Sequence, residues 1–165
     1  MRIPFDEILI EVHLLPLQSE GNEEYVLVDT GCVLAAMRHF DSVVYRLERG
    51  TLRLAILEIT INEVAEHLRR SQSKLSQKGF STRGVRSAIE NFRKLLQYDK
   101  VKKIANPVIP EKVLSFYAHF REDSLLAYVL FEGNFKALIT QDSSLAERVG
   151  KDKYMPCKRL WTDQS

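Results

Sequence analysis

The stretch Tyr25–Met37, which reads YVLVDTGCVLAAM, constrains the fold more than any other part of the chain. Tyr25–Val28 is a short apolar run, typical of a strand that is buried on both faces. Cys32–Met37 contains good helix formers, so the chain is expected to pass from a buried strand into a helix. Asp29 lies at the turn between them, where open α/β sheets bind ligands. Its simpler role is to cap the helix, a role that Thr30 would share.

Strand-like and helix-like segments alternate along the rest of the chain. Strands are expected near residues 8–15, 52–61, 101–108, 135–140 and 154–160. Helices are expected near residues 41–47, 62–78, 83–98, 110–120, 124–131 and 143–149. This alternation predicts a three-layer α/β/α fold with a mostly parallel central sheet of about five strands. The segment at 8–15 adds a predicted N-terminal edge strand that ends near Pro16.

Length and composition describe an ordinary globular chain. Its 165 residues, 45% of them hydrophobic, are enough for one domain with a real core, preceded by an extension over residues 1–24. The net charge of +2 is too small to argue for nucleic acid by itself. Cys32 and Cys157 form no CxxC pair, so reduced thiols are expected, with a disulfide between them left open. We expect a soluble cytoplasmic protein, because no signal peptide or membrane span is visible.

Acidic residues recur at the expected turns. Asp29, Glu63 and Asp142 each follow a predicted strand, and parallel strands would bring all three to one edge of the sheet. Asp123 begins a predicted helix and is placed less firmly by this argument. Clustered carboxylates repel one another unless they are protonated or hold a cation. Carboxylate-only sites suit Mg²⁺ or Mn²⁺, which can activate water for attack on phosphorus. Phosphodiester hydrolysis is therefore the expected chemistry.

Four segments resemble a known family. VDTGCVLAAM, ITINEVAEHLRR, REDSLLAYVLFEG and LITQDSSLAERV resemble the acidic motifs of PIN-domain nucleases, which include the toxins of the VapBC toxin–antitoxin class. The resemblance covers about residues 25–160, with the motifs in the family's order. It implies a PIN-like nuclease domain over residues 25–165 and a ribonuclease that cuts single-stranded RNA with Mg²⁺ or Mn²⁺. A toxin would also have an antitoxin protein as partner, and a homodimer is expected because similar proteins often form one.

The resemblance also assigns roles to residues. Asp29, Glu63, Asp123 and Asp142 take the places of the family's metal-site acids. Asp29 and Asp142 would hold the metal, while Glu63 and Asp123 complete or orient the site, and Thr30 supports the first acid. Two substitutes stay open.

Glu122 could replace Asp123, because the stretch before it is compressed, and Glu66 could replace Glu63, one turn away. His67, one turn past Glu63, is a further residue that could approach the site. The basic face over residues 83–94 and the cations Arg69, Lys74 and Lys78 read more simply as solvated surface than as an RNA path.

Other function classes fit less well. A haloacid-dehalogenase phosphatase would need a second acid two residues after Asp29, where Gly31 stands. A phosphorylation-receiver domain would need a paired acidic turn after its first strand and a lysine at a late strand end, where this chain has Thr140-Gln141. A non-catalytic PIN-like RNA-binding or scaffolding module is the remaining alternative, and the presence of all four acids speaks against it.

Overall fold

Five parallel strands form the central sheet, in the order β5-β4-β3-β6-β7. The structure is a computed structural model that describes residues 1–161. The strands of this sheet are β3 (Val26–Val28), β4 (Leu54–Leu57), β5 (Val101–Ile104), β6 (Ala137–Thr140) and β7 (Tyr154–Pro156). Val26 lies between Leu54 of β4 and Ala137 of β6, so β3 is the middle strand.

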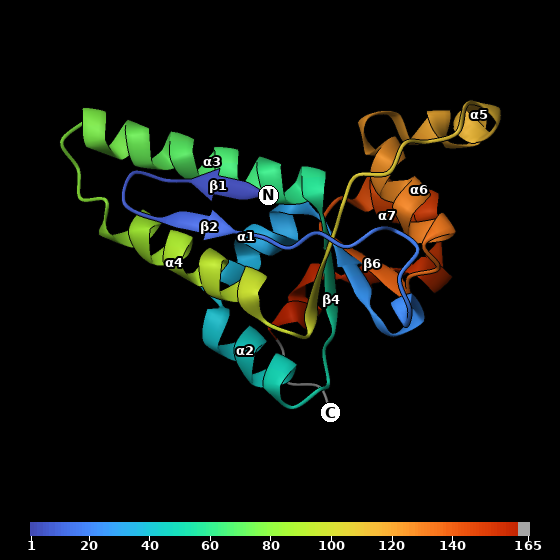
Figure 1. The fold of residues 1–165 in the computed structure, drawn as a ribbon, viewed down its shortest axis with the longest axis horizontal. Helices are drawn as coiled ribbons and strands as arrows, with labels where there is room; N and C mark the ends of the chain where they lie inside the picture. Colours follow the sequence, from blue (N-terminus) through green and yellow to red (C-terminus); the bar gives the residue numbers. More distant parts are fainter. Residues whose placement is uncertain (162–165) are drawn as a thin grey trace.

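Helices connect the strands and cover the sheet (Figure 1). The α-helices are α1 (Thr30–Arg38), α2 (Phe40–Glu48), α3 (Glu58–Gln77), α4 (Arg83–Gln97), α5 (Leu114–Tyr117), α6 (Ser124–Glu132) and α7 (Ser143–Val149). Short 3₁₀ turns are η1 (Asn22–Glu24), η2 (Glu111–Val113), η3 (Ala118–Asp123), η4 (Lys151–Lys153) and η5 (Cys157–Leu160). None of the helices within residues 1–161 combines the length and the hydropathy that crossing a bilayer requires.

The hydrophobic core is divided into two layers by the sheet. Val26 and Val28 pack into one layer, with buried side chains of α1, α3 and α4. Leu27 points the other way, into a layer with buried side chains of α6 and α7. All three residues are buried, which explains why β3 is apolar throughout rather than alternating. The predicted three-layer α/β/α fold is confirmed.

The order of the strands reverses direction once. The chain runs outward from β3 through β4 to β5, and then returns to place β6 on the other side of β3. In open parallel sheets, the carboxyl ends of the two strands at such a reversal form the crevice where ligands bind. Asp29 follows β3, and Asp142 lies just past the end of β6.

The N-terminal segment differs from the prediction. Instead of adding an edge strand to the central sheet, β1 (Arg2–Pro4) and β2 (Leu9–Glu11) form a separate antiparallel hairpin. The hairpin lies across α3 and α4 (Figure 1) and buries Ile3 and Ile10 against them. An isolated parallel bridge between Leu15 and Ile104 links this segment to the sheet. The alternating pattern was read correctly as a strand, but its partner was wrong.

One local prediction is also corrected. Ile59–Ile61 belongs to the first turn of α3 rather than to the end of a strand. Reciprocal hydrogen bonds hold that helix start: Ile59 N–H donates to Asn106 Oδ1 at 2.9 Å, and Asn106 N–H donates to Glu58 Oε1 at 3.0 Å.

Candidate functional site

Asp29 uses both of its carboxylate oxygens in the structure. Oδ1 accepts a hydrogen bond from Cys32 N–H at 3.0 Å, which makes Asp29 the N-cap of α1. Oδ2 accepts a hydrogen bond from the hydroxyl of Thr140, at the end of β6. The predicted capping role is therefore correct, and it leaves the second oxygen directed towards the neighbouring strand end.

Asp142 is bound to the same hydroxyl. Its backbone N–H donates to Thr140 Oγ1 at 3.0 Å, and its Oδ1 caps α7 by accepting from Leu145 N–H at 3.1 Å. Thr140 is fully buried. Because one buried hydroxyl contacts both acidic turns, Thr140 positions Asp29 relative to Asp142.

Glu63 approaches from α3 and is held by Thr30. The hydroxyl of Thr30 donates to Glu63 Oε2 at 2.7 Å. Thr30 thus supports Glu63 rather than Asp29, for which Thr140 provides the hydroxyl. Glu66, the alternative to Glu63, instead forms exposed ion pairs with Arg69 and Arg70.

Glu122 and Asp123 reach the site through a backbone kink. Arg121 has a φ of 54° and a ψ of −123°, a conformation that non-glycine residues rarely adopt. The kink lies inside η3, three residues before α6 begins at Ser124, and the Ser124 hydroxyl donates to Tyr117 O at 2.9 Å. Glu122 is exposed and Asp123 is half-buried.

A cavity of about 140 Å³ collects most of these acids. Its lining residues are Asp29, Thr30, Gly31, Ile59, Thr60, Glu63, Glu122, Asp123, Leu125 and Leu126. Three of the four predicted acids therefore face one cavity, together with the alternative Glu122. Asp142 lies beside the cavity rather than in its wall, and neither Glu66 nor His67 lines it.

The acids influence one another electrostatically. Burial raises the pKa of Asp29, and the charges of Asp142 and Glu63 raise it further, while the hydrogen bonds from Thr140 and Cys32 lower it. Burial also raises the pKa of Asp123, with repulsion from Glu122, Asp142 and Asp29 adding to the shift. The site therefore concentrates negative charge that a bound cation would relieve.

Arg148 is a residue of this site that sequence reasoning missed. Its charge opposes the raised pKa of Asp123, and its guanidinium is held by the backbone oxygens of Ser144 and His119. No motif marks an arginine on the last turn of a short helix. Only the packing of α7 against η3 brings it to the acids.

The donor set fits a hard divalent cation by its chemistry, because it consists of carboxylates that repel one another around a small cavity. As they are oriented, however, no three His, Cys, Asp or Glu side chains within residues 1–161 are close enough to ligate one ion. Asp29 is engaged by Thr140 and Cys32, and Glu63 is engaged by Thr30. Binding would therefore require small rotations of these side chains.

The two cysteines meet beneath the site. Cys32 of α1 and Cys157 of η5 form a disulfide with a Cα–Cα distance of 5.6 Å, so the expectation of reduced thiols is corrected. Gln141 Nε2 lies 3.5 Å from Cys157 Sγ, next to the turn that carries Asp142. The sequence left this pairing open without supporting it, because the cysteines lie 125 residues apart.

No protein-family model matches the chain, and no curated protein matches it. Among solved structures, the fold is similar to that in the crystal structure of PAE2754 from Pyrobaculum aerophilum. The two share a TM-score of 0.60 and 25% sequence identity, over 92% of this chain and 95% of that one. This similarity extends over nearly the whole chain and supports the α/β architecture. It gives no information about activity.

Proposed function

We propose that this chain is a PIN-like, metal-dependent endoribonuclease that hydrolyses phosphodiester bonds of single-stranded RNA. It would act as the toxin of a toxin–antitoxin pair, with an antitoxin protein as partner, or as an RNA-processing enzyme. The proposed cofactor is Mg²⁺ or Mn²⁺. The proposed location is the cytoplasm, and the proposed assembly is a homodimer.

The observation that carries this proposal is the convergence of Asp29, Glu63 and Asp123 on one cavity, with Asp142 beside it. These residues come from four separate segments of the chain. Capping alone explains the positions of Asp29 and Asp142, which begin α1 and α7. It does not explain Glu63, which lies inside α3, or Asp123, whose side chain caps nothing.

Each residue has a separate task in the proposed mechanism. Asp29 and Asp142 would hold the divalent ion, which supplies an activated water and stabilises charge on the phosphate. Thr140 links the carboxylate of Asp29 to the backbone N–H of Asp142, and Glu63, which accepts a hydrogen bond from Thr30, would complete or orient the site. Asp123 lines the same cavity as Asp29 and Glu63. Water would attack phosphorus, and the P–O bond to one nucleoside would break.

Cleavage of a labelled single-stranded RNA in Mn²⁺, Mg²⁺ or EDTA tests this proposal. We expect metal-dependent cleavage by the wild type and loss of cleavage in Asp29→Asn and Asp142→Asn, whose amides can still cap their helices. Glu66→Gln is the matched control, because Glu66 lies outside the acid cavity. Cleavage that survives Asp29→Asn at full rate would refute the assignment of the site.

One observation favours a second candidate, a non-catalytic PIN-like RNA-binding or scaffolding module. As oriented, the described acids do not bring three ligands together around one point. A protein that binds RNA but neither binds Mn²⁺ in isothermal titration calorimetry nor cleaves RNA would support this alternative.

A further inference from the structure

One side of α3 carries a regular stripe of exposed polar residues that begins at the acid cavity. Its members are Glu63, His67, Arg70, Lys74 and Gln77, all exposed and spaced by four, three, four and three residues. This spacing places them along a single side of a helix. At about 1.5 Å per residue, the stripe extends for roughly 21 Å from the site.

Three neighbouring hollows that share lining residues follow this stripe. The acid cavity shares Thr30, Ile59 and Glu63 with a neighbouring hollow of about 520 Å³, which continues to His67 and Arg70. That hollow shares His67 and Arg70 with a third one, of about 390 Å³. The third hollow is also lined by Ser71, Ser73, Lys74 and Gln77. An extended polymer can therefore lie along α3 with one of its units at the acids.

The charges along the stripe change sign with distance from the acids. Glu63 stands at the cavity, whereas Arg70 and Lys74 stand two and three turns further along the helix. Arg70 Nε lies 3.5 Å from Glu66 Oε1, but both side chains are more than half exposed, and such pairs are weak. Within residues 1–161, no carboxylate forms a salt bridge with Lys74. Both cations are therefore available to a ligand.

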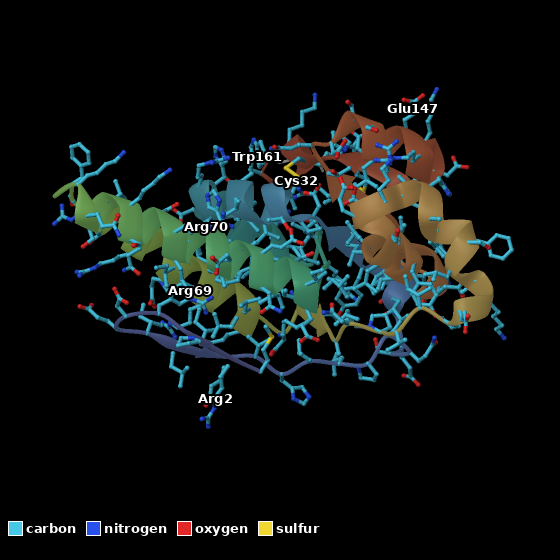
Figure 2. All side chains as sticks on the ribbon, turned by 90° about the horizontal axis from the view of Figure 1, so that it is seen from above. Arg2, Cys32, Arg69, Arg70, Glu147 and Trp161 are labelled. Carbon is cyan, nitrogen blue, oxygen red and sulfur yellow. A yellow bond between two sulfur atoms is a disulfide. The ribbon has the colours of Figure 1, made fainter. Side chains whose placement is uncertain are left out.

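Arg69 differs from Arg70 although the two are adjacent. Its Nε donates to Pro4 O at 3.0 Å, and its guanidinium lies over the ring of Phe5. Figure 2 shows Arg69 nearer to the N-terminal hairpin than Arg70. The hairpin thus binds Arg69, and Arg70 remains as the arginine of the stripe.

We propose that this stripe is the path of the single-stranded RNA flanking the cut, with Arg70 and Lys74 contacting phosphates two or more positions from the reacting one. The proposal rests on the proposed ribonuclease function and adds the direction in which the strand leaves the site. A polyanion fits this pattern for two reasons. The acidic cluster would hold the metal ion that binds the reacting phosphate, and the basic side chains further along α3 would bind the phosphates that follow. Contacts to the RNA backbone of this kind do not distinguish one base sequence from another.

The test compares Arg70→Gln/Lys74→Gln with Arg2→Gln/Lys94→Gln, which removes the same two charges from the hairpin and α4. Fluorescence anisotropy measures binding of a labelled ten-nucleotide RNA across a salt series, and cleavage of the same RNA and of a dinucleotide is followed in Mn²⁺. For the stripe variant we expect binding about tenfold weaker. The slope of log affinity against log salt should fall by about 1.4, since each single-strand phosphate contact contributes about 0.7. Dinucleotide cleavage and the control variant should stay within twofold of the wild type.

The outcomes separate this inference from the function on which it rests. If the wild type cleaves the RNA but both variants bind with equal affinity and salt slope, the path is wrong and the nuclease proposal stands. If the wild type binds RNA through the stripe without cleaving it, the path stands and catalysis fails. If it binds no RNA, or if a polyglutamate peptide competes as well as RNA does, the path is overturned.

Discussion

Replacing Thr140 with valine tests how one buried hydroxyl organises the acidic site. Valine has nearly the same shape, so the fully buried position stays filled. The change removes the hydrogen bond that Thr140 donates to Asp29 Oδ2 and the one that it accepts from Asp142 N–H. Hydrogen bonds to charged groups contribute about 1.5–3 kcal/mol and neutral ones about 0.5–1.5 kcal/mol. We therefore expect the free energy of unfolding at pH 7.5 to fall by about 2–4.5 kcal/mol.

The pH dependence identifies the cause. Burial raises the pKa of Asp29 above its ordinary value of 3.8, so ionised Asp29 destabilises the folded state. This cost is fully present above the folded pKa and disappears as the pH falls through that pKa towards 3.8. Thr140→Val removes a donor that favours the carboxylate, which raises the folded pKa of Asp29 further. The difference in stability between variant and wild type should therefore shrink as the pH falls from 7.5 to about 4.

The assay is urea unfolding in EDTA at both pH values, with Thr140→Ser as the control. Serine keeps the hydroxyl and loses one buried methyl group, which costs about 1 kcal/mol at either pH. Equal destabilisation by valine and serine, with no dependence on pH, would refute the role of the Thr140 hydroxyl. A steric effect of valine alone would be the same at both pH values.

Three further predictions concern stability. Gly133→Ala should destabilise the fold by several kcal/mol in urea titration, because the added Cβ would lie 2.5 Å from Val129 O and 2.7 Å from two side chains. Gly84→Ala is the control, because a Cβ at Gly84 meets open space. Equal stability of the two variants would contradict the packing around Gly133. Reduction of the Cys32–Cys157 disulfide should lower the melting temperature, since a bridge across 125 residues stabilises the folded state by up to about 4.7 kcal/mol in the chain-entropy model. An unchanged melting temperature with dithiothreitol would show that the bond is absent. Asn106→Ala should cost about 1 kcal/mol through loss of the cap on α3, whereas Asn106→Asp, which keeps the accepting oxygen, should cost less.

The elements were predictable where a single segment decides its own structure. The apolar run before Asp29 is buried on both faces, and the period of α4 places Val85, Ile89 and Phe92 in the core. Prediction of an element failed where its structure depends on a residue that is distant in the sequence. Ile59–Ile61 has strand propensity, but the chain must turn away from the sheet after Leu57, and the cap from Asn106 begins a helix there.

The site followed the same rule. Asp29 and Asp142 were predictable because each follows a strand, and the convergence of parallel strand ends is general. The partners of these acids were not predictable. Thr30 was expected to support Asp29, yet its hydroxyl bonds Glu63, because α3 packs against α1 at this point. Arg148 reached the site without any local signal.

The order of the strands explains why these partners could not be assigned from the sequence. Alternating strands and helices predict parallel pairing, but they do not state which strand returns to lie beside β3. In this fold β6 does so, and the reversal of strand order then falls between Asp29 and Thr140. If β6 had joined the other edge, beyond β5, Asp29 and Asp142 would stand at the same end of the sheet but several strands apart. With strands about 4.8 Å apart, three intervening steps would separate the acids by about 14 Å, too far to share one ion. The candidate site therefore depends on this single topological choice as much as on the acids themselves.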